Sequence, residues 1–341
     1  MQKNVFSHIR SSVEEKRRNL SQWVETAPEP EKEICLTTCD NCVDEEIAVL
    51  DETLEKVESE AYGVCEVCHG RIEQGVLEID YTATICLDCL SETQRRELEF
   101  ELEFSSEIQR ALLPQKAPEI PGLEIGAFSR PAQIIGGDYF DFFQFKNGAH
   151  GFAIADVSGH GFSSSLLMSS LQTALHTISA ESDSVAEVIQ RINKYFLHNV
   201  NLTTFLTLFI GKYEPDRHRL TYSNAGHNPP LLYHRNGKDS FDWLSPTGAA
   251  VGLMEDYKIG TGLVVLQPED ILFLYTDGVT ELMNPSREFF GPNRLADMVA
   301  TNSALPAQEL VSALRRGLDD FQQGEVLTDD VTMVAVKATE D

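Results

Sequence analysis

The sequence lacks long apolar stretches. It contains no run of about 18 apolar residues, the length that a membrane-spanning helix needs. The N-terminal stretch MQKNVFSHIRSSVEEKRRNL also lacks the apolar core of a secretory signal. These two absences predict a cytoplasmic protein without a membrane partner.

Basic residues are scarce. The chain carries 27 Lys and Arg against 54 Asp and Glu, a formal net charge of -27. It therefore has no broad basic face to neutralise phosphates, and nucleic acid is not expected as a partner. The negative charge instead suits a protein that attracts divalent cations. A length of 341 residues predicts about two domains.

Cysteine is absent after position 89, and all seven cysteines lie between positions 35 and 89. In a reducing compartment, paired cysteines indicate a metal site rather than a disulfide. The pairs CEVC (65–68) and CLDC (86–89) have the spacing of a closed tetrahedral zinc site, although two redox pairs would share the pattern. The expected ligands of this structural zinc are Cys65, Cys68, Cys86 and Cys89. His69 is expected beside the site and not as a ligand.

The remaining cysteines, Cys35, Cys39 and Cys42, form the stretch CLTTCDNC. They offer three ligands, one fewer than a closed zinc or iron–sulfur site needs. Unligated thiols in a loop and a redox-sensitive site with a borrowed fourth ligand are both compatible with this pattern.

Two amphipathic segments precede the zinc pairs. Residues 5–24 and 44–61 place apolar side chains at helical spacing, and prolines between them predict an antiparallel helical hairpin. With the stretch AYGVCEVCHGRIEQGVLEIDYTATICLDC, residues 44–96 resemble the DksA/TraR-type zinc finger. Members of that family act on RNA polymerase through a hairpin tip. The tip here, around residues 27–42, lacks their acidic motif. The resemblance therefore implies a borrowed scaffold or sensor rather than a module that binds RNA polymerase.

A linker follows in residues 95–114, RRELEFELEFSSEIQRALLP. Its leucines and phenylalanines alternate with glutamates as in a strand, yet its residues favour a helix and no turn residue occurs before Pro114. We predict a helix. Such a helix has one apolar stripe of Leu98 and Leu102 and a nearly opposite one of Phe100, Phe104 and Ile108. Two stripes need two partners, which predicts a homodimer joined through the linker.

From residue 123 onward, short apolar strands alternate with turns and helices. The predicted strands are Leu123–Ser129, Gly151–Ala155, Phe205–Tyr213, Arg219–Ser223, Leu231–His234, Ile271–Tyr275 and Val331–Val336. The predicted helices cover residues 162–180, 185–199, 293–300 and 306–322. This order indicates a layered α+β sandwich. The expected domains are 1–92 for hairpin and zinc finger, 93–114 for the linker and 115–341 for the sandwich.

Acids recur where these strands end. They are Asp138 and Asp141 in GGDYFD, Asp156 in ADVSGHG, Asp277 in YTDG, and Asp329 and Asp330 in LTDDVTMV. The stretch ADVSGHG alone is compatible with a turn as much as with a metal site. Several such sets instead predict a convergent carboxylate cluster, whose members would repel one another unless cations lay between them.

Oxygen ligands select hard cations such as Mg²⁺ or Mn²⁺. Two such cations can activate a water molecule for phosphoester hydrolysis. The glycines of ADVSGHG would let the backbone approach, and a carbonyl near Val157 could be a further ligand. His160 is compatible with a ligand, an acid or a packing residue. His227, in AGHNPP, is compatible with a turn.

The motifs GGDYFD, ADVSGHG, SNAGHNPPLL, YTDGVTELMN…FFG and DDVTMV occur in the order of the SpoIIE/RsbU branch of the metal-dependent Ser/Thr phosphatases, which residues 105–338 resemble. The resemblance implies an αββα sandwich with two Mn²⁺ or Mg²⁺ ions. It implies that Asp156 bridges both cations, that Val157 lends a carbonyl, and that Asp138, Asp277 and Asp329 complete the set. Asp330 is the alternative to Asp329.

The same resemblance implies a protein serine/threonine phosphatase. Members of this branch usually act on an anti-sigma factor antagonist in a partner-switching pathway that controls transcription. The alternatives are a DksA-like RNA polymerase regulator that uses the phosphatase fold as a scaffold, and a phosphatase of a small metabolite.

Overall fold

The computed structural model describes residues 13–14, 17–18, 21, 42–58, 62–73, 76–77, 83–158, 162–199, 205–235 and 240–340. The chain forms two compact units, residues 1–101 and 102–341. Most of the predicted helix 5–24 lies outside the described residues, as do Cys35 and Cys39.

The first unit contains helix α3 (Cys42–Glu58), which confirms the helix expected over residues 44–61 within a few residues. Leu50 is fully buried on this helix. After it, the cysteine-containing segment folds around a small apolar cluster and the short 3-10 helix η1 (Leu87–Cys89). The buried members of this cluster are Tyr62, Cys65, Ile72, Leu77 and Cys86.

Helix α5 (Glu92–Leu112) confirms the helical interpretation of the linker. A capping box begins it. The Gln94 backbone N–H donates to Ser91 Oγ at 3.3 Å, and the Ser91 N–H donates to Gln94 Oε1 at 3.1 Å. Pro114 follows the end of the helix, because proline cannot continue it. Local capping therefore outweighs the strand-like alternation of leucine, phenylalanine and glutamate.

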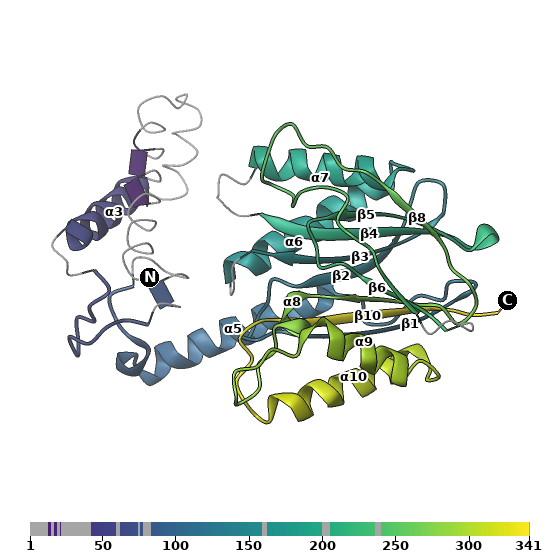
Figure 1. The fold of residues 1–341 in the computed structure, drawn as a ribbon. Coiled ribbons are helices and arrows are strands. Elements are labelled where there is room, and N and C mark those ends of the chain that lie inside the picture. Colours follow the sequence, from purple (N-terminus) through teal and green to yellow (C-terminus); the bar gives the residue numbers. More distant parts are fainter. Residues whose placement is uncertain are drawn as a thin grey trace. The chain divides into compact units, whose positions relative to one another are not determined.

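The second unit is a sandwich of two five-stranded antiparallel sheets (Figure 1). The first sheet has the order β1 (Leu123–Arg130), β10 (Val331–Ala338), β9 (Ile271–Tyr275), β6 (Leu231–His234) and β7 (Ser240–Trp243). The second has the order β2 (Tyr139–Gln144), β3 (His150–Val157), β4 (Leu206–Glu214), β5 (Arg219–Ala225) and β8 (Gly262–Val265). The short 3-10 helix η2 (Pro215–Arg217) joins β4 to β5.

Helices cover the outer face of each sheet. In Figure 1, α6 (Phe162–Ser179) and α7 (Val185–Asn199) lie over the second sheet, and α9 (Gly291–Thr301) and α10 (Ala307–Gln322) lie over the first. The one-turn helix α8 (Asp277–Thr280) follows β9. Among the described helices, none combines the length and apolar character that a membrane span requires.

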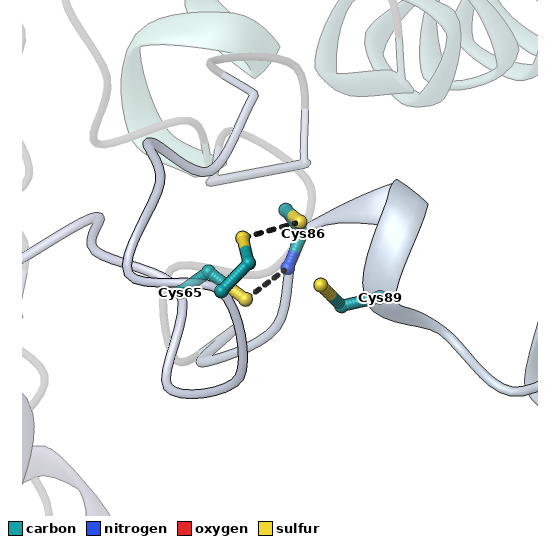
Figure 2. A group of neighbouring side chains, drawn as sticks. Cys65, Cys86 and Cys89 are labelled. Carbon is teal, nitrogen blue, oxygen red and sulfur yellow. Dashed lines mark hydrogen bonds between the residues drawn. The ribbon is translucent and has the colours of Figure 1, made fainter.

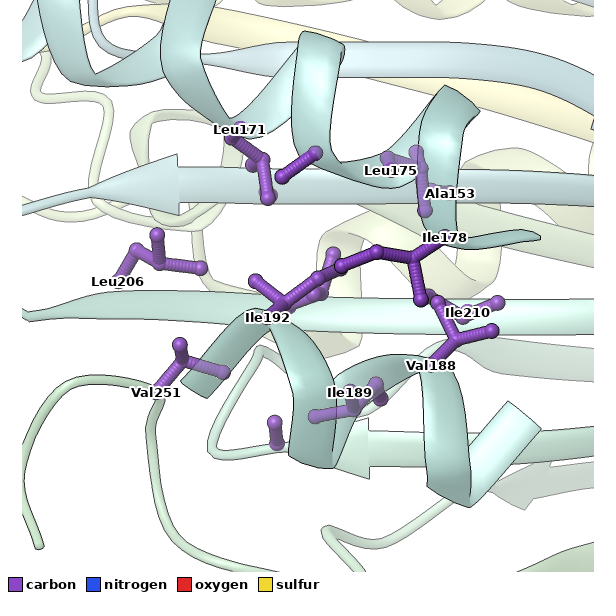
Figure 3. Packing of buried hydrophobic residues seen from close by; sticks show 14 of the residues in the cluster. Ala153, Leu171, Leu175, Ile178, Val188, Ile189, Ile192, Leu206, Ile210 and Val251 are labelled. Atoms are coloured by element: carbon purple, nitrogen blue, oxygen red, sulfur yellow. The ribbon is translucent and has the colours of Figure 1, made fainter. Parts of the chain in front are cut away.

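Helix α7 shows why these layers form. Its buried residues Val185, Val188, Ile189, Ile192 and Phe196 recur at helical spacing and make one apolar face. Figure 3 shows that face packed with α6 against residues of β3 and β4 such as Ala153 and Ile210. The sequence pattern therefore decides which side of α7 meets the sheet.

A second apolar layer fills the space between the two sheets, and we call it the inner core. Its buried residues are Ile120, Leu123, Ile125, Phe140, Phe152, Ile154, Phe209, Tyr213, Leu220, Leu232, Leu244, Leu266, Leu272, Leu274, Val334, Val336 and Ala338. Strand β3 is buried on both faces, which explains why GFAIA is apolar without alternation. The four-layer α+β sandwich confirms the predicted fold class.

Three strands were not among those predicted. Strand β2 has the sequence YFDFFQ, in which Asp141 interrupts the apolar pattern. Strands β7 and β8 contain four residues each and lie at sheet edges, where partial exposure weakens the pattern.

Candidate active site

The inner core changes from apolar to polar at one end. Phe152 and Ile154 of β3 belong to the inner core, and side chains alternate along a strand, so Asp156 faces the same space. In the other sheet, Leu274 of β9 belongs to the inner core, and Thr276 continues its face. Polar groups of both sheets therefore meet at this end.

Asp138 lies directly before β2 and is 6% exposed. Its Oδ2 accepts a hydrogen bond from Thr276 Oγ1 at 2.7 Å. Burial, followed by the charges of Asp156 and Asp330, raises the pKa of Asp138 well above its usual range, and the hydrogen bond from Thr276 opposes this. Asp138 and Thr276 thus join the two sheets at the polar end.

Asp156 lies among other acids near the end of β3. Burial, followed by the charges of Asp277, Asp329 and Asp330, raises its pKa to about 7. The pKa of Asp277 is raised as well, chiefly by burial. The structure thus brings the predicted acids of the site, from four separate motifs, within electrostatic reach of one another.

Asp329 and Asp330 have different surroundings, which distinguishes between the two predicted alternatives. Asp330 is 9% exposed, and its Oδ1 and Oδ2 accept backbone hydrogen bonds from Ala132 at 2.7 Å and Gly137 at 2.6 Å. It fixes the loop that leads to Asp138. Asp329 is exposed, and its Oδ1 accepts the Asp330 N–H at 2.9 Å. This arrangement favours Asp329 as the carboxylate that can meet a cation.

Two glycines allow the neighbouring loops to pack closely around Asp330. A Cβ at Gly136 would lie 2.2 Å from Asp330 Oδ2, and one at Gly278 would lie 2.0 Å from the Asp330 carbonyl oxygen. Real Cβ contacts are never this short, because the atoms would overlap. The glycines of GGD and TDG therefore permit close packing of three loops around Asp330.

Val157 is the last residue of β3 and is fully buried. Its carbonyl oxygen faces the loop before Asp138, since a Cβ at Gly137 would lie 3.0 Å from it. Residues 159–161, with His160, lie outside the described residues. The interpretation of those glycines as a close backbone approach thus stays a prediction.

Asp141, which shares the motif GGDYFD with Asp138, belongs to a different cluster. Its Oδ1 accepts the Phe142 N–H at 2.7 Å, and its Oδ2 contacts the Tyr139 hydroxyl and, at 2.6 Å, His176 Nε2 of α6. The prediction that Asp141 belongs to the convergent acids is therefore wrong. The alternation of side chains in β2 explains the outcome, because Asp138 and Asp141 differ by an odd number of residues and face opposite sides.

The surroundings of the acids fit divalent cations. Burial and, after it, the charges of neighbouring acids raise the pKa values of Asp138 and Asp156, and cations would relieve the repulsion between the ionised groups. Among the described residues, the four cysteines are the group whose ligand atoms all lie within 4.8 Å of one another, so the acids form a wider arrangement.

The four predicted cysteines gather in the first unit. Figure 2 shows three of them, Cys65, Cys86 and Cys89, with their side chains turned toward one another. The Sγ atoms of Cys68 and Cys86 lie 3.6 Å apart, and the Cys86 N–H donates to Cys65 Sγ at 3.4 Å. Backbone hydrogen bonds from Cys68 and Cys86 lower the pKa of Cys65, whereas burial raises the pKa of Cys86 and the neighbouring thiols raise that of Cys89. A tetrahedral sulfur site of this kind suits zinc.

Sequence analysis did not single out Thr276. It lies in the quoted motif YTDG, beside the acid that received attention. Its hydroxyl donates to Asp138 and accepts the Thr332 N–H at 3.0 Å, so it connects β9, β10 and the start of β2. The sequence did contain a signal for this role, because Thr276 directly precedes Asp277 and continues the alternation of inward-facing residues of the strand.

The two antiparallel sheets with helices on their outer faces define a PP2C-like fold. Among solved structures, the SiaA-PP2C domain of Pseudomonas aeruginosa superposes with a TM-score of 0.63 at 22% identity. The match covers 73% of this chain and 99% of that domain. At this identity the likeness shows the fold alone.

The family described as Stage II sporulation protein E (SpoIIE) matches residues 146–339, more than half of the chain. Phosphoserine phosphatase RsbU of Bacillus subtilis (strain 168) is 31% identical over 246 residues, which are 71% of this chain and 71% of RsbU. Phosphoserine phosphatase RsbP of the same organism is 24% identical over 240 residues, 69% of this chain and 57% of RsbP. The chain belongs to the SpoIIE family.

Proposed function

We propose that this chain is a metal-dependent protein phosphatase that hydrolyses phosphoserine and phosphothreonine. Membership of the SpoIIE family and the names of RsbU and RsbP support a Ser/Thr protein phosphatase. The observation that carries the proposal is the convergence of acids from both sheets at one end of the inner core, with the pKa of Asp156 raised to about 7.

The residues that would hold two Mn²⁺ or Mg²⁺ ions are Asp138, Asp156, Asp277, Asp329 and the Val157 carbonyl. When bound, the cations supply an activated water and neutralise charge on the phosphoryl group. Asp156 lies between the other acids and is the residue suited to bridge both cations. Thr276 orients Asp138, and Asp330 fixes the loop before Asp138 through Ala132 and Gly137.

The proposed substrate is a phosphorylated anti-sigma factor antagonist in a partner-switching pathway. Two observations support a phosphoprotein of this kind. The sequence motifs resemble the SpoIIE/RsbU branch throughout residues 105–338, and the RsbU match spans similar shares of both chains.

We further propose that α5 transmits a signal to the active site as part of a homodimer. Ser106 Oγ donates to the Ile134 carbonyl at 3.0 Å, and the Gln109 side chain exchanges two hydrogen bonds with the Gly136 backbone. Both contacts hold the loop that precedes Asp138. The opposite stripe, Phe100, Phe104 and Ile108, is 68%, 54% and 49% exposed.

The cysteine cluster is proposed as a structural zinc site within a sensing unit. Its four sulfur ligands leave no open position for a substrate, so it would stabilise the fold and take no part in hydrolysis. A cytoplasmic location, where such thiols stay reduced, is part of this proposal.

The test is release of phosphate from a phosphoserine protein with and without Mn²⁺. We expect activity that depends on Mn²⁺ and falls at least about tenfold in Asp138→Asn. Asp216→Asn is the matched control, because Asp216 is exposed on η2 between β4 and β5. Equal rates in wild type and Asp138→Asn would refute the assignment of the site, and hydrolysis of small phosphate esters alone would refute the protein substrate.

A further inference from the structure

His227 lies in the connection between β5 and β6, where the chain passes from one sheet to the other. It is 2% exposed, so it cannot meet a protein substrate. Burial lowers the pKa of its imidazole to about 4, and the ring is therefore neutral at pH 7. A buried neutral histidine needs a partner for each ring nitrogen.

One ring nitrogen contacts the sheet that carries Asp156. His227 Nδ1 lies 2.8 Å from Thr207 Oγ1. Thr207 is the direct partner of Asp156 in the antiparallel pairing of β3 and β4. Directly paired residues place their side chains on the same face, so Thr207 faces the polar end together with Asp156.

The second sheet also acts on the imidazole, through the backbone at the end of β9. His227 Nε2 is buried and makes no hydrogen bond of normal geometry. The backbone carbonyl of Tyr275 nevertheless acts on the ring and opposes the effect of burial on its pKa. Tyr275 ends β9 and is followed by Thr276 and Asp277, so His227 is linked to β4, the neighbour of the strand that carries Asp156, and to the strand that leads to Asp277.

The turn around His227 does not require an imidazole. Asn224 Oδ1 accepts the His227 N–H at 2.8 Å, and Asn224 Nδ2 donates to the Leu244 carbonyl at 3.3 Å. The fully buried Asn224 side chain thus shapes the backbone, and the ring remains to be explained. This separates His227 from the turn-forming role that the motif AGHNPP suggested.

We propose that His227 is a positioning residue, which sets the separation of the two sheets so that Asp156 and Asp277 can share divalent cations. It acts through Thr207 on one side and the Tyr275 backbone on the other, without touching a cation or substrate. The inference deepens the proposed function and rests on it for the identity of the site.

Thr207 offers the sharpest test, because its shape can be kept while its hydroxyl is removed. In the full chain, Thr207→Val lacks the hydroxyl, and Thr207→Ser keeps it. His227→Asn removes the reach to Tyr275. His218→Asn is the matched control, since His218 lies in the turn before β5 and its φ of 46° is one that asparagine tolerates. Mn²⁺ binding is measured by calorimetry, beside thermal melting without metal.

We expect Thr207→Val and His227→Asn to bind Mn²⁺ about tenfold more weakly, the low end of the loss seen when a direct partner of a metal ligand is removed, because both residues act on the acids through the backbone. Thr207→Ser and His218→Asn should bind it as wild type does. Saturating Mn²⁺ should restore most of the phosphate-release rate in the weakened variants, which a residue in the chemistry itself would not allow.

Unchanged Mn²⁺ affinity in folded Thr207→Val and His227→Asn would overturn the proposal, even if both melted at lower temperature, because a purely structural role predicts that result. Failure of the proposed function looks different. Wild type would then bind Mn²⁺ without releasing phosphate from a phosphoprotein, while the order of Mn²⁺ affinities among the variants would still test His227.

Discussion

Asp156 illustrates a conflict between stability and activity within one residue. Its pKa rises to about 7 because it is buried beside other acids. A carboxyl whose pKa is raised by folding favours the folded state only while it is protonated. Without cations, the ionised form of Asp156 therefore opposes folding, increasingly so from about pH 4 up to its raised pKa.

Asp156→Asn should consequently stabilise the metal-free chain at pH 8 and leave its stability nearly unchanged at pH 4. One pKa unit corresponds to about 1.4 kcal/mol, so the gain has an upper limit of about 4 kcal/mol. The same variant should lose at least about nine-tenths of its Mn²⁺-dependent phosphate release. Thermal melts at both pH values, with and without Mn²⁺, test both effects, and a metal-free variant less stable than wild type at pH 8 would contradict this account.

Asp329 and Asp330 should give opposite results when each is replaced by asparagine. Asp330→Asn places an amide nitrogen against a backbone N–H and should cost about 1–3 kcal/mol of folding free energy. Asp329→Asn should barely change the melting temperature and should weaken Mn²⁺ binding at least about tenfold. Melting and calorimetry on both variants decide the matter, and a reversed pattern would assign the cation to Asp330.

His176 also makes the stability of the chain depend on pH, through a favourable contact rather than through repulsion between acids. Its hydrogen bond to Asp141 is the main cause of its raised pKa. A raised histidine pKa contributes stability that is full below about pH 6.5 and is lost as pH rises through the folded-state value. His176→Gln should therefore destabilise the chain more at pH 6 than at pH 9, as measured by chemical denaturation. An equal loss at both pH values would show that the charge of His176 plays no part.

Among the helices, α5 has two sides with different surroundings. One side binds the loop before Asp138 through Ser106 and Gln109. The other exposes Phe100 and Phe104 beside a row of exposed glutamates. Burial of large apolar side chains gains about 1.5–3 kcal/mol each, while the glutamates of a second parallel copy would repel. A dimer contact between two copies of α5 would therefore be reversible.

Replacing Phe100 and Phe104 with serine should convert a dimer into a monomer with an altered phosphatase rate. Light scattering at tens of micromolar measures the mass, and Val326→Ser is the control because Val326 is 84% exposed elsewhere. A monomeric wild type would remove the dimer from the proposal. A double variant that stays dimeric would place the contact outside α5.

At the scale of the whole molecule, the two compact units divide the predicted metals between them. The cysteines lie within residues 1–101 and the acids within residues 102–341. Sulfur ligands suit zinc, and carboxylates suit Mg²⁺ or Mn²⁺. Each unit should therefore keep its own metal when the other site is damaged.

Cys86→Ser should abolish binding of one zinc per chain and leave Mn²⁺-dependent hydrolysis measurable. His69→Asn should retain the zinc, because His69 is not an expected ligand and its φ of 57° suits asparagine. Elemental analysis after dialysis gives the zinc content. Equal zinc in wild type and Cys86→Ser would exclude the site, and loss of zinc in His69→Asn would make the histidine a ligand.

The order of most strands and helices, the four-cysteine group, the helical linker and the motifs that contain the acids could all be predicted from the sequence. These features depend on local periodicity, capping and motif spacing, which short stretches contain. The sequence also determined the α+β sandwich, because motifs in a fixed order resemble one family and the fold follows.

Tertiary structure alone decided which acids belong together and what surrounds them. Asp141 turns toward α6 because side chains alternate along β2, a strand that the sequence pattern did not reveal. Asp330 accepts hydrogen bonds from a loop nearly two hundred positions earlier in the chain. His227 lies near Thr207 and Tyr275 only because the two sheets pack together. Such contacts join residues distant in the chain, so no local pattern encodes them.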